Sequence, residues 1–186
     1  GGTAEFATNI DLDILDFKGM IDVVKREDIA LTIVGPEVPL VAGIVDAFEK
    51  EGLRIFGPNA HAAQLEGSKQ FSKDFMKQHN IKTARYKSAT SYDEAVAHLS
   101  SFDYPLVIKD DGLAAGKGVV IVENEQQALE ALRDLFSGSL AHREDTSVVI
   151  ETFLDGYEVS QLCFVAKNKL YPLDTSQDYK RIGEND

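Results

Sequence analysis

Two short apolar runs, each with a Gly-Pro pair at its end, constrain the fold of this chain more than any other feature. The pairs are Gly35-Pro36 and Gly57-Pro58. The runs are LTIVG (Leu31 to Gly35) and RIFGP (Arg54 to Pro58), and a helical segment from Val41 to Glu51 separates them. A strand, a helix and a strand of these lengths predict a right-handed crossover and a parallel sheet. The two Gly-Pro turns then lie at the carboxyl edge of that sheet, where open α/β folds bind ligands.

The pattern changes after a longer helix that we expect from Ala62 to Asn80. Beyond it, short strands alternate with only two helices, one of which begins with Ser91 and Glu94 at capping-box spacing. The expected elements are strands at 84–88, 105–109 and 118–124, a helix at 125–136 capped by Asn124, a strand in SVVIETFL, and a hairpin made by VSQLCFVA and LYPL. This order predicts a compact α+β module after the parallel unit.

Charge and composition exclude several classes of protein. The 186 residues are 44% apolar and carry a formal net charge of −12, which would repel a nucleic-acid backbone over most of the surface. No apolar run approaches the ~20 residues that a membrane span needs. An anionic ligand must therefore meet local positive charge, such as lysines in a cleft. We expect a cytoplasmic protein that binds neither nucleic acid nor membrane.

Cysteine and histidine give no sign of a redox or metal site. Cys163 is the only cysteine, which excludes an internal disulfide and favours a reducing compartment. We predict an inert core thiol, because it lies in a strand-like run with no activating base nearby. The histidines lack metal-ligand spacing and are predicted to be surface or structural residues: His61, His79, His98 and His142.

The segment DGLAAGKGVV (Asp111 to Val120) is the most informative motif. A Walker A loop needs four residues between its glycines, then Lys followed by Ser or Thr, then a helix. Here three residues separate Gly112 from Gly116, Gly118 follows Lys117, and β-branched residues come next. The loop therefore joins two strands. Its free backbone N–H groups and its lysine suit a flap over a nucleotide.

A glycine-rich turn without function would fit the same residues, so two further features matter. Lys109 ends the apolar strand PLVIK, where a lysine that reaches a buried phosphate is expected. Glu151 closes another apolar strand, VVIE. Each signal alone is weak, and together they indicate a nucleotide cleft.

The ordered set LTIVGPEVPLVAGIVDAFEKEG, RIFGPNAHAAQLEGSKQFSKDFM, VIKDDGLAAGKGVVIV, ETFLDGYEVS and TSQDYKRIG closely resembles the glycinamide ribonucleotide synthetase family, also called phosphoribosylamine glycine ligases. This resemblance covers nearly the whole chain. It implies an ATP-grasp ligase of de novo purine biosynthesis that joins glycine to 5-phosphoribosylamine through a glycyl phosphate. The implied fold is α/β, with a Rossmann-like unit at 1–65 that lacks its first strand and an incomplete ATP-grasp domain at 66–186, whose α+β lid spans about 87–151.

The resemblance also implies roles for individual residues and cofactors. Lys109 and Lys117 are the expected catalytic residues, and ATP and Mg²⁺ are the expected cofactors, with metal ligands beyond residue 186. The expected ATP-binding residues are Lys69, Lys109, Gly112, Ala114, Gly116, Lys117, Gly118, Glu151, Phe153, Leu154 and Glu158. The expected sugar-phosphate residues are Gly1, Gly2, Thr3, Gly35, Pro36, Glu37, Asp178, Lys180 and Arg181.

Three positions depart from the family pattern. Asp110 stands where a small residue is usual, and its negative charge beside phosphate-binding groups costs little only if it points to solvent. Thr152 replaces an acid that is common in the hinge, and Tyr179 takes a place often held by histidine. On sequence alone Lys69, Glu158 and the Lys180–Arg181 pair also fit solvated surface positions.

Two other functions stay open at this point. Another ATP-grasp enzyme, such as a biotin-dependent or purine carboxylase, would not account for GPEVPL. A nucleotide-binding module without turnover is the expectation for the isolated 186 residues, which read as an internal piece of a longer protein. We expect that protein to begin earlier with a strand and a GxGxxG-like turn, and to continue past Asp186 with a glycine-rich segment.

Overall fold

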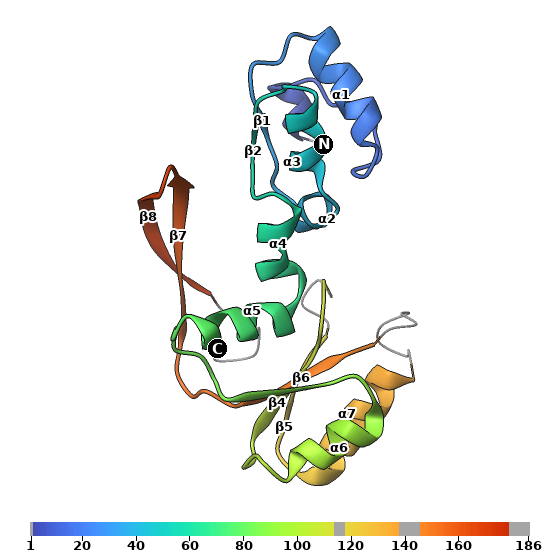
Figure 1. Cartoon of the computed structure of the whole chain (residues 1–186), viewed down its shortest axis with the longest axis vertical. Helices are drawn as coiled ribbons and strands as arrows, with labels where there is room; N and C mark the ends of the chain where they lie inside the picture. The colour runs from blue at the N-terminus through green and yellow to red at the C-terminus, as the bar shows by residue number, and fades with distance from the viewer. Residues whose placement is uncertain (1, 114–117, 138–145, 179–186) are drawn as a thin grey trace. The chain divides into compact units, whose positions relative to one another are not determined.

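A computed structural model describes residues 2–113, 118–137 and 146–178 (Figure 1). Contacts divide the chain into two units, Gly1–Phe153 and Leu154–Asp186. Each unit is described by itself below.

The first unit contains a small parallel pair of strands near its amino-terminal end. Strand β1 (Thr32–Ile33) lies beside β2 (Ile55–Phe56) in parallel register, with Thr32 opposite Ile55, which confirms the predicted parallel pairing. Both strands are shorter than expected. The other elements here are η1 (Gly2–Glu5), α1 (Phe17–Arg26), α2 (Glu37–Val41) and α3 (Ile44–Lys50). Helices α1 and α3 supply the small core of Val24, Ile44, Val45 and Phe48.

The single helix predicted from Ala62 to Asn80 is wrong, because the chain forms two helices there. Helix α4 (Ala60–Gly67) ends and α5 (Lys69–Gln78) begins at Ser68, whose backbone is extended (φ −138°, ψ 119°). The Ser68 hydroxyl accepts a hydrogen bond from the Phe71 N–H at 3.0 Å. Ser68 is therefore the N-cap of α5, and a serine at this position favours a helix start over a continuous helix.

A four-stranded antiparallel sheet follows, in the order β3-β6-β4-β5. Its strands are β3 (Tyr86–Ala89), β4 (Leu106–Asp110), β5 (Val119–Val122) and β6 (Val148–Thr152), and its helices are α6 (Tyr92–Leu99) and α7 (Glu125–Phe136). The β4–β5 pair confirms that the glycine-rich loop joins two strands. Helix α7 matches its predicted bounds.

Strand periodicity gives this sheet two different faces. One face carries Leu106, Ile108, Val148 and Ile150, which are fully buried in a core with α6 and α7. By the strand registers, the opposite face carries Tyr86, Lys109 and Glu151. Figure 1 shows α6 and α7 on one side of the sheet and α5 on the other.

Local hydrogen bonds confirm both predicted helix starts. The Asn124 side chain accepts from the Gln127 N–H at 3.0 Å, and Ser91 accepts from the Glu94 N–H at 3.3 Å. The Glu94 carboxylate reaches back to the Thr90 N–H at 2.9 Å, one residue before the cap. These contacts set where α7 and α6 begin.

The second unit is the predicted hairpin of β7 (Glu158–Ala166) and β8 (Lys169–Asp178), which pair antiparallel. Its apolar side chains are exposed, among them Leu162 at 58% and Val165 at 61%. Cys163 is exposed as well, so the predicted core thiol is wrong. The thiol is in a strand, as expected, but among the described residues 154–178 of this unit no second layer covers the hairpin.

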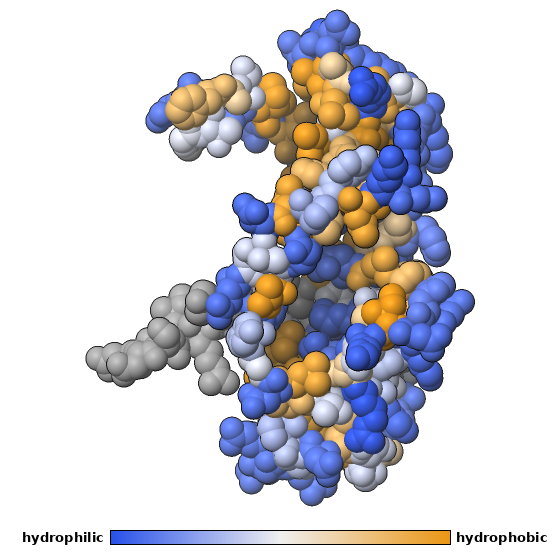
Figure 2. Space-filling model, turned by 90° about the vertical axis from the view of Figure 1, so that its left-hand side faces the viewer, coloured by the Kyte–Doolittle hydropathy of each residue, from blue (hydrophilic) through white to orange (hydrophobic). Residues whose placement is uncertain are grey.

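Surface and helix length add two general observations. Figure 2 shows hydrophobic residues reaching the surface among hydrophilic ones, in agreement with exposed side chains such as Phe6, Ile33 and Tyr157. Within the described residues, none of the helices has the length and apolar character to cross a membrane.

Candidate functional site

Three charged side chains meet where α5 faces the sheet, and we call them the lysine–glutamate cluster: Lys73 of α5, Lys109 of β4 and Glu151 of β6. Lys73 Nζ lies 2.8 Å from Glu151 Oε2, and Lys109 Nζ lies 3.0 Å from Glu151 Oε1. The contact with Lys109 is a close ion pair without hydrogen-bond alignment, because Oε1 accepts no hydrogen bond among the described residues. Two cations thus face one carboxylate.

Burial differs sharply within this cluster. The side chains of Glu151 and Lys73 are 6% and 10% exposed, whereas that of Lys109 is 27% exposed. Lys73 Nζ also donates to Thr83 Oγ1 at 2.7 Å and lies 5.9 Å from the centre of the Tyr86 ring. Lys73 is therefore enclosed by protein groups, and Lys109 is the cation that solvent or a ligand can reach.

Tyr86 borders the cluster on the neighbouring strand. Its hydroxyl donates to Asp74 Oδ1 of α5 at 2.6 Å. Burial, followed by this hydrogen bond and the negative charge of Asp74, raises the pKa of Tyr86 to about 12. Tyr86 therefore stays protonated and neutral at physiological pH.

The start of α5 is tied to the turn that follows β4. Lys69 Nζ donates to the Gly112 carbonyl at 2.7 Å. Asp111 accepts from the Ser68 hydroxyl and the Gln70 N–H at 3.1 Å each, and from the Ser147 hydroxyl at 3.3 Å. A carboxylate suits this place, because the first N–H groups of a helix lack partners and carry partial positive charge.

The glycine-rich turn is described only at its two ends. Gly112 is buried and has φ +115°, a conformation that glycine adopts without steric cost. Gly118 is buried too, and its carbonyl accepts from the Asp110 N–H at 2.7 Å. Ala114, Gly116 and Lys117 lie outside the described residues.

The Asp110 side chain does not point to solvent, the position in which its negative charge would cost little. It is 2% exposed and, by the β4 register, it lies on the face of the sheet toward α6 and α7, whereas Lys109 is on the other face. Side chains alternate along a strand, so β4 itself separates the Asp110 carboxylate from the lysine–glutamate cluster.

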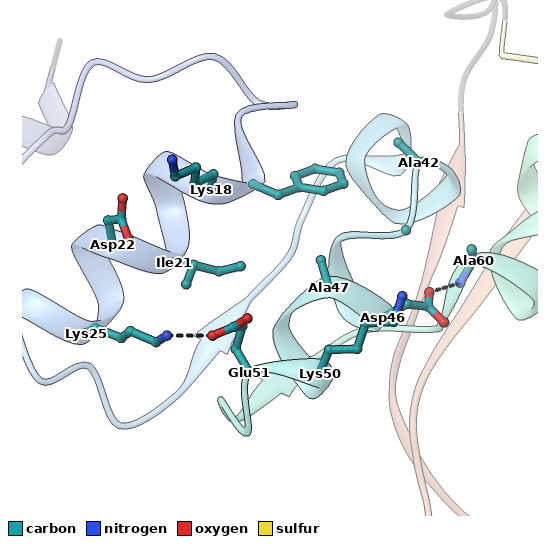
Figure 3. A pocket seen from close by; sticks show the side chains of 12 residues that line it. Lys18, Ile21, Asp22, Lys25, Ala42, Asp46, Ala47, Lys50, Glu51 and Ala60 are labelled. Carbon is teal, nitrogen blue, oxygen red and sulfur yellow. Dashed lines mark hydrogen bonds and ion pairs between the residues drawn. The ribbon is translucent and has the colours of Figure 1, made fainter.

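A separate hollow of about 680 Å³ lies between α1 and α3 (Figure 3). Lys25 spans it to Glu51 at 2.6 Å, and Asp46 accepts from the Ala60 N–H at 2.8 Å. The Lys25 hydrogen bond and charge lower the pKa of Glu51. Lysines and acids alternate along its lining, so the hollow has no clear preference for an anion.

Two family models together match the whole chain. The model for the phosphoribosylglycinamide synthetase N domain matches residues 1–66, and the model for the phosphoribosylglycinamide synthetase ATP-grasp (A) domain matches residues 67–186. The chain belongs to the phosphoribosylglycinamide synthetase family. The resemblance seen in the sequence is thereby confirmed.

Relatives of known name agree with this membership. The phosphoribosylamine–glycine ligase of Xanthomonas campestris pv. campestris is 49% identical over 187 residues, which cover 100% of this chain and 43% of that protein. The Haemophilus influenzae ligase is 47% identical over 178 residues, or 96% of this chain and 42% of that protein. The chain thus spans less than half the length of these curated relatives.

Solved structures confirm the ATP-grasp fold. The phosphoribosylamine–glycine ligase of Thermotoga maritima matches with a TM-score of 0.77 and 31% identity, over 97% of this chain and 42% of that one. N5-carboxyaminoimidazole ribonucleotide synthetase of Thermus thermophilus matches with a TM-score of 0.72 and 19% identity, over 96% of this chain and 45% of that one. The second likeness concerns the fold alone.

The lysines expected from the family lie on two elements that face each other. Lys109 is on β4, and Lys69 begins α5 one helical turn before Lys73. Residues four apart share one face of a helix, so Lys69 and Lys73 are on the same side of α5. Through Lys73 and Glu151, that side contacts Lys109. The structure thus gathers three of the expected residues, Lys69, Lys109 and Glu151, and Lys69 also contacts Gly112.

The expected hinge and substrate residues lie on several other elements. Phe153 follows β6 and is half-buried; Leu154 and Glu158 are exposed and belong to the second unit. Gly35 and Pro36 form the exposed turn after β1, and Glu37 begins α2. Gly2 and Thr3 are in η1, and Asp178 ends β8 opposite Glu158. Gly1, Tyr179, Lys180 and Arg181 lie outside the described residues.

No metal site emerges from the part of the chain that is described. No group of three His, Cys, Asp or Glu side chains could hold an ion there. His61 packs edge-on against Phe71, His79 lies against Phe75 after α5, and His98 is 3.9 Å from Glu94. His142 is outside the described residues.

Sequence reasoning missed Lys73, Thr83 and Asp111 as parts of this site. Lys73 carried one usable signal, because it follows Lys69 by four residues and so shares its helix face. Asp111 was visible only as the first residue of the glycine-rich motif. Its contacts with α5 join residues more than 40 positions apart, which no local pattern reports.

Proposed function

We propose that this chain is the ATP-facing part of a phosphoribosylamine–glycine ligase, an enzyme that forms glycinamide ribonucleotide in purine biosynthesis. Family membership over the whole chain supports the reaction. The observation that carries the site is the placement of two lysines beside the glycine-rich turn. Lys109 is on strand β4 of the sheet, and Lys69 is at the start of α5, which faces the sheet. The division at residue 65 and a lid at about 87–151 belong to the same proposal.

The proposed reaction has two steps. A carboxylate oxygen of glycine attacks the γ-phosphorus of ATP, so the bond to the β-phosphate oxygen breaks and ADP leaves. The amine nitrogen of phosphoribosylamine then attacks the carbonyl carbon of the glycyl phosphate, and phosphate leaves as the amine loses a proton. Both steps need charge neutralisation, alignment and exclusion of water.

The residues of this chain meet those needs mainly as cations and as backbone donors. Lys69, Lys109 and Lys117 offset phosphate charge, and the glycine-rich turn presents N–H groups to phosphate oxygens. Backbone groups of Glu151, Phe153 and Leu154 border the adenine, and Glu158 binds the ribose hydroxyls. The remaining expected residues receive the sugar phosphate: Gly1, Gly2, Thr3, Gly35, Pro36, Glu37, Asp178, Lys180 and Arg181.

Magnesium is part of this proposal but has no ligand named in the chain. When bound with ATP, Mg²⁺ would supply further charge neutralisation at the phosphates. Acidic and amide oxygens, which Mg²⁺ prefers, are expected beyond residue 186. A reducing, cytoplasmic location fits a chain with one exposed cysteine.

The test is steady-state kinetics of the full-length ligase, in which ADP release depends on both glycine and phosphoribosylamine. Lys109→Ala and Lys117→Ala should each raise the KM for ATP by at least about tenfold, because each removes a cation from the phosphates. Lys87→Ala, an exposed lysine on β3, is the matched control. Unchanged kinetics in both site variants would remove the phosphate role.

For the isolated 186 residues we propose nucleotide binding without turnover. The chain covers 43% of the Xanthomonas relative, so much of the family's catalytic apparatus is outside it. We expect weak ATP binding by calorimetry and no ligation. Measurable glycinamide ribonucleotide formation by this chain alone would contradict this second proposal.

A further inference from the structure

Lys73 is a buried lysine whose burial the proposed reaction does not explain. The residue is 8% exposed, and its Nζ already contacts Glu151, Thr83 and the Tyr86 ring. An ammonium group so enclosed has no room to contact a ligand as well. Any effect of Lys73 on a ligand must therefore pass through one of these partners.

Glu151 is the partner that connects Lys73 to the more exposed Lys109. Its carboxylate is 6% exposed and lies between two ammonium groups. A buried carboxylate needs compensating charge and hydrogen bonds, because removing it from water is costly. Lys73 supplies both to Oε2, at 2.8 Å.

Lys109 benefits from this arrangement. Among the described residues its Nζ pairs with Glu151 Oε1, at 3.0 Å, and its side chain keeps 27% exposure. An ammonium group has three N–H donors, so donors remain for an anion. Without Lys73, Lys109 would be the one described cation beside Glu151, and the charge of Lys109 would then be taken up in neutralising that carboxylate.

We propose that Lys73 is a positioning residue, which neutralises Glu151 so that Lys109 keeps its charge and its donors for the phosphates of ATP. This inference rests on the proposed function and adds to it a residue that never touches ATP. In this cluster Lys73 of α5 contacts Glu151 of β6, and Glu151 contacts Lys109 of β4.

The experiment compares Lys73→Met with Lys77→Met in the full-length ligase. Lys77 is an exposed lysine one turn further along α5, so it controls for loss of a positive charge on the same helix. Lys73→Met should raise the KM for ATP by about tenfold or more and leave the KM for glycine within about twofold. Lys77→Met should change neither constant.

A double variant separates positioning from simple packing. In Lys73→Met/Glu151→Gln the carboxylate that competes for Lys109 is gone, so the KM for ATP should return to within about threefold of wild type. This variant also decides the question if Lys73→Met alone fails to fold, because it leaves no buried charge unpaired.

Three results would overturn the inference. They are a Lys73→Met enzyme that matches Lys77→Met, an equal rise of the KM for ATP and for glycine, and a double variant as impaired as Lys109→Ala. The wild-type enzyme is measured first. A wild type without ATP-dependent ligation would contradict the proposed function itself, which is a different outcome from a wild type that works and variants that do not respond.

Discussion

The two antiparallel sheets of this chain are built from similar apolar residues but use them differently. In β3-β6-β4-β5, alternate residues such as Ile108 and Ile150 are fully buried under α6 and α7. In the β7–β8 hairpin, Leu162 and Val165 are more than half exposed. Strand pattern alone therefore does not create a core. A covering layer does, and it also leaves the opposite sheet face available for charged groups.

Replacement of a buried residue should give the largest contrast between the sheets. Ile150→Ala removes a fully buried side chain from the core with α6 and α7 and should lower the free energy of unfolding by about 3 kcal/mol. Leu162→Ala in the hairpin should change it by less than about 0.5 kcal/mol. Urea unfolding of the chain, followed by circular dichroism, measures both. Equal losses would mean that the hairpin is covered in solution.

Asp111 tests whether the sheet is fastened to α5 through the turn after β4. Asp111→Ala removes the acceptor for the Ser68 hydroxyl and the Gln70 N–H, and should cost about 1–2 kcal/mol, as loss of a helix cap does. Asp155→Ala is the control, because Asp155 is an exposed acid in the turn before β7. The same urea experiment applies, and a cost no larger than that of Asp155→Ala would contradict a fastening role.

Asn124 tests how much the stability of α7, one of the two helices that cover the sheet, depends on its N-cap. Asn124→Ala removes the acceptor of the Gln127 N–H at the start of α7 and should cost about 1 kcal/mol. Glu130→Ala, on the exposed side of the same helix, should cost only a few tenths. Thermal unfolding resolves this difference. A neutral Asn124→Ala would mean that packing of residues such as Leu132 alone determines where α7 begins.

Much of the fold could be predicted because its signals are local. The Gly-Pro runs gave the parallel pair, the spacing of Asn124 and Gln127 gave α7, and β-branched residues on both sides of the glycine turn gave the β4–β5 hairpin. The break at Ser68 was missed, because residues 62–80 carry a helical pattern on both sides of it. Its cap became evident only from the Asp111 and Phe71 contacts.

The site was predicted in part, for a related reason. Lys109 and Glu151 could be predicted because each is a charged residue at the end of an apolar strand. Lys69 was predicted from the family resemblance. Lys73 and Glu151 are 78 positions apart, so their contact depends on how α5 lies on the sheet. Asp110 shows the same limit, because only the strand register reveals that it faces away from Lys109.

Tyr86 gives the smallest expected effect and probes the charged face of the sheet through pH. Its pKa is raised to about 12 in the folded chain, so the neutral hydroxyl favours folding below pH ~10, and that contribution is lost as pH rises from ~10 through ~12. Tyr86→Phe removes the group that titrates. The difference in unfolding free energy between wild type and Tyr86→Phe should therefore shrink from about pH 8 to about pH 11. A difference that stays constant would show that neither burial nor Asp74 raises the pKa of Tyr86 in the folded chain, and that this edge of the charged face, like the hairpin, is open to water.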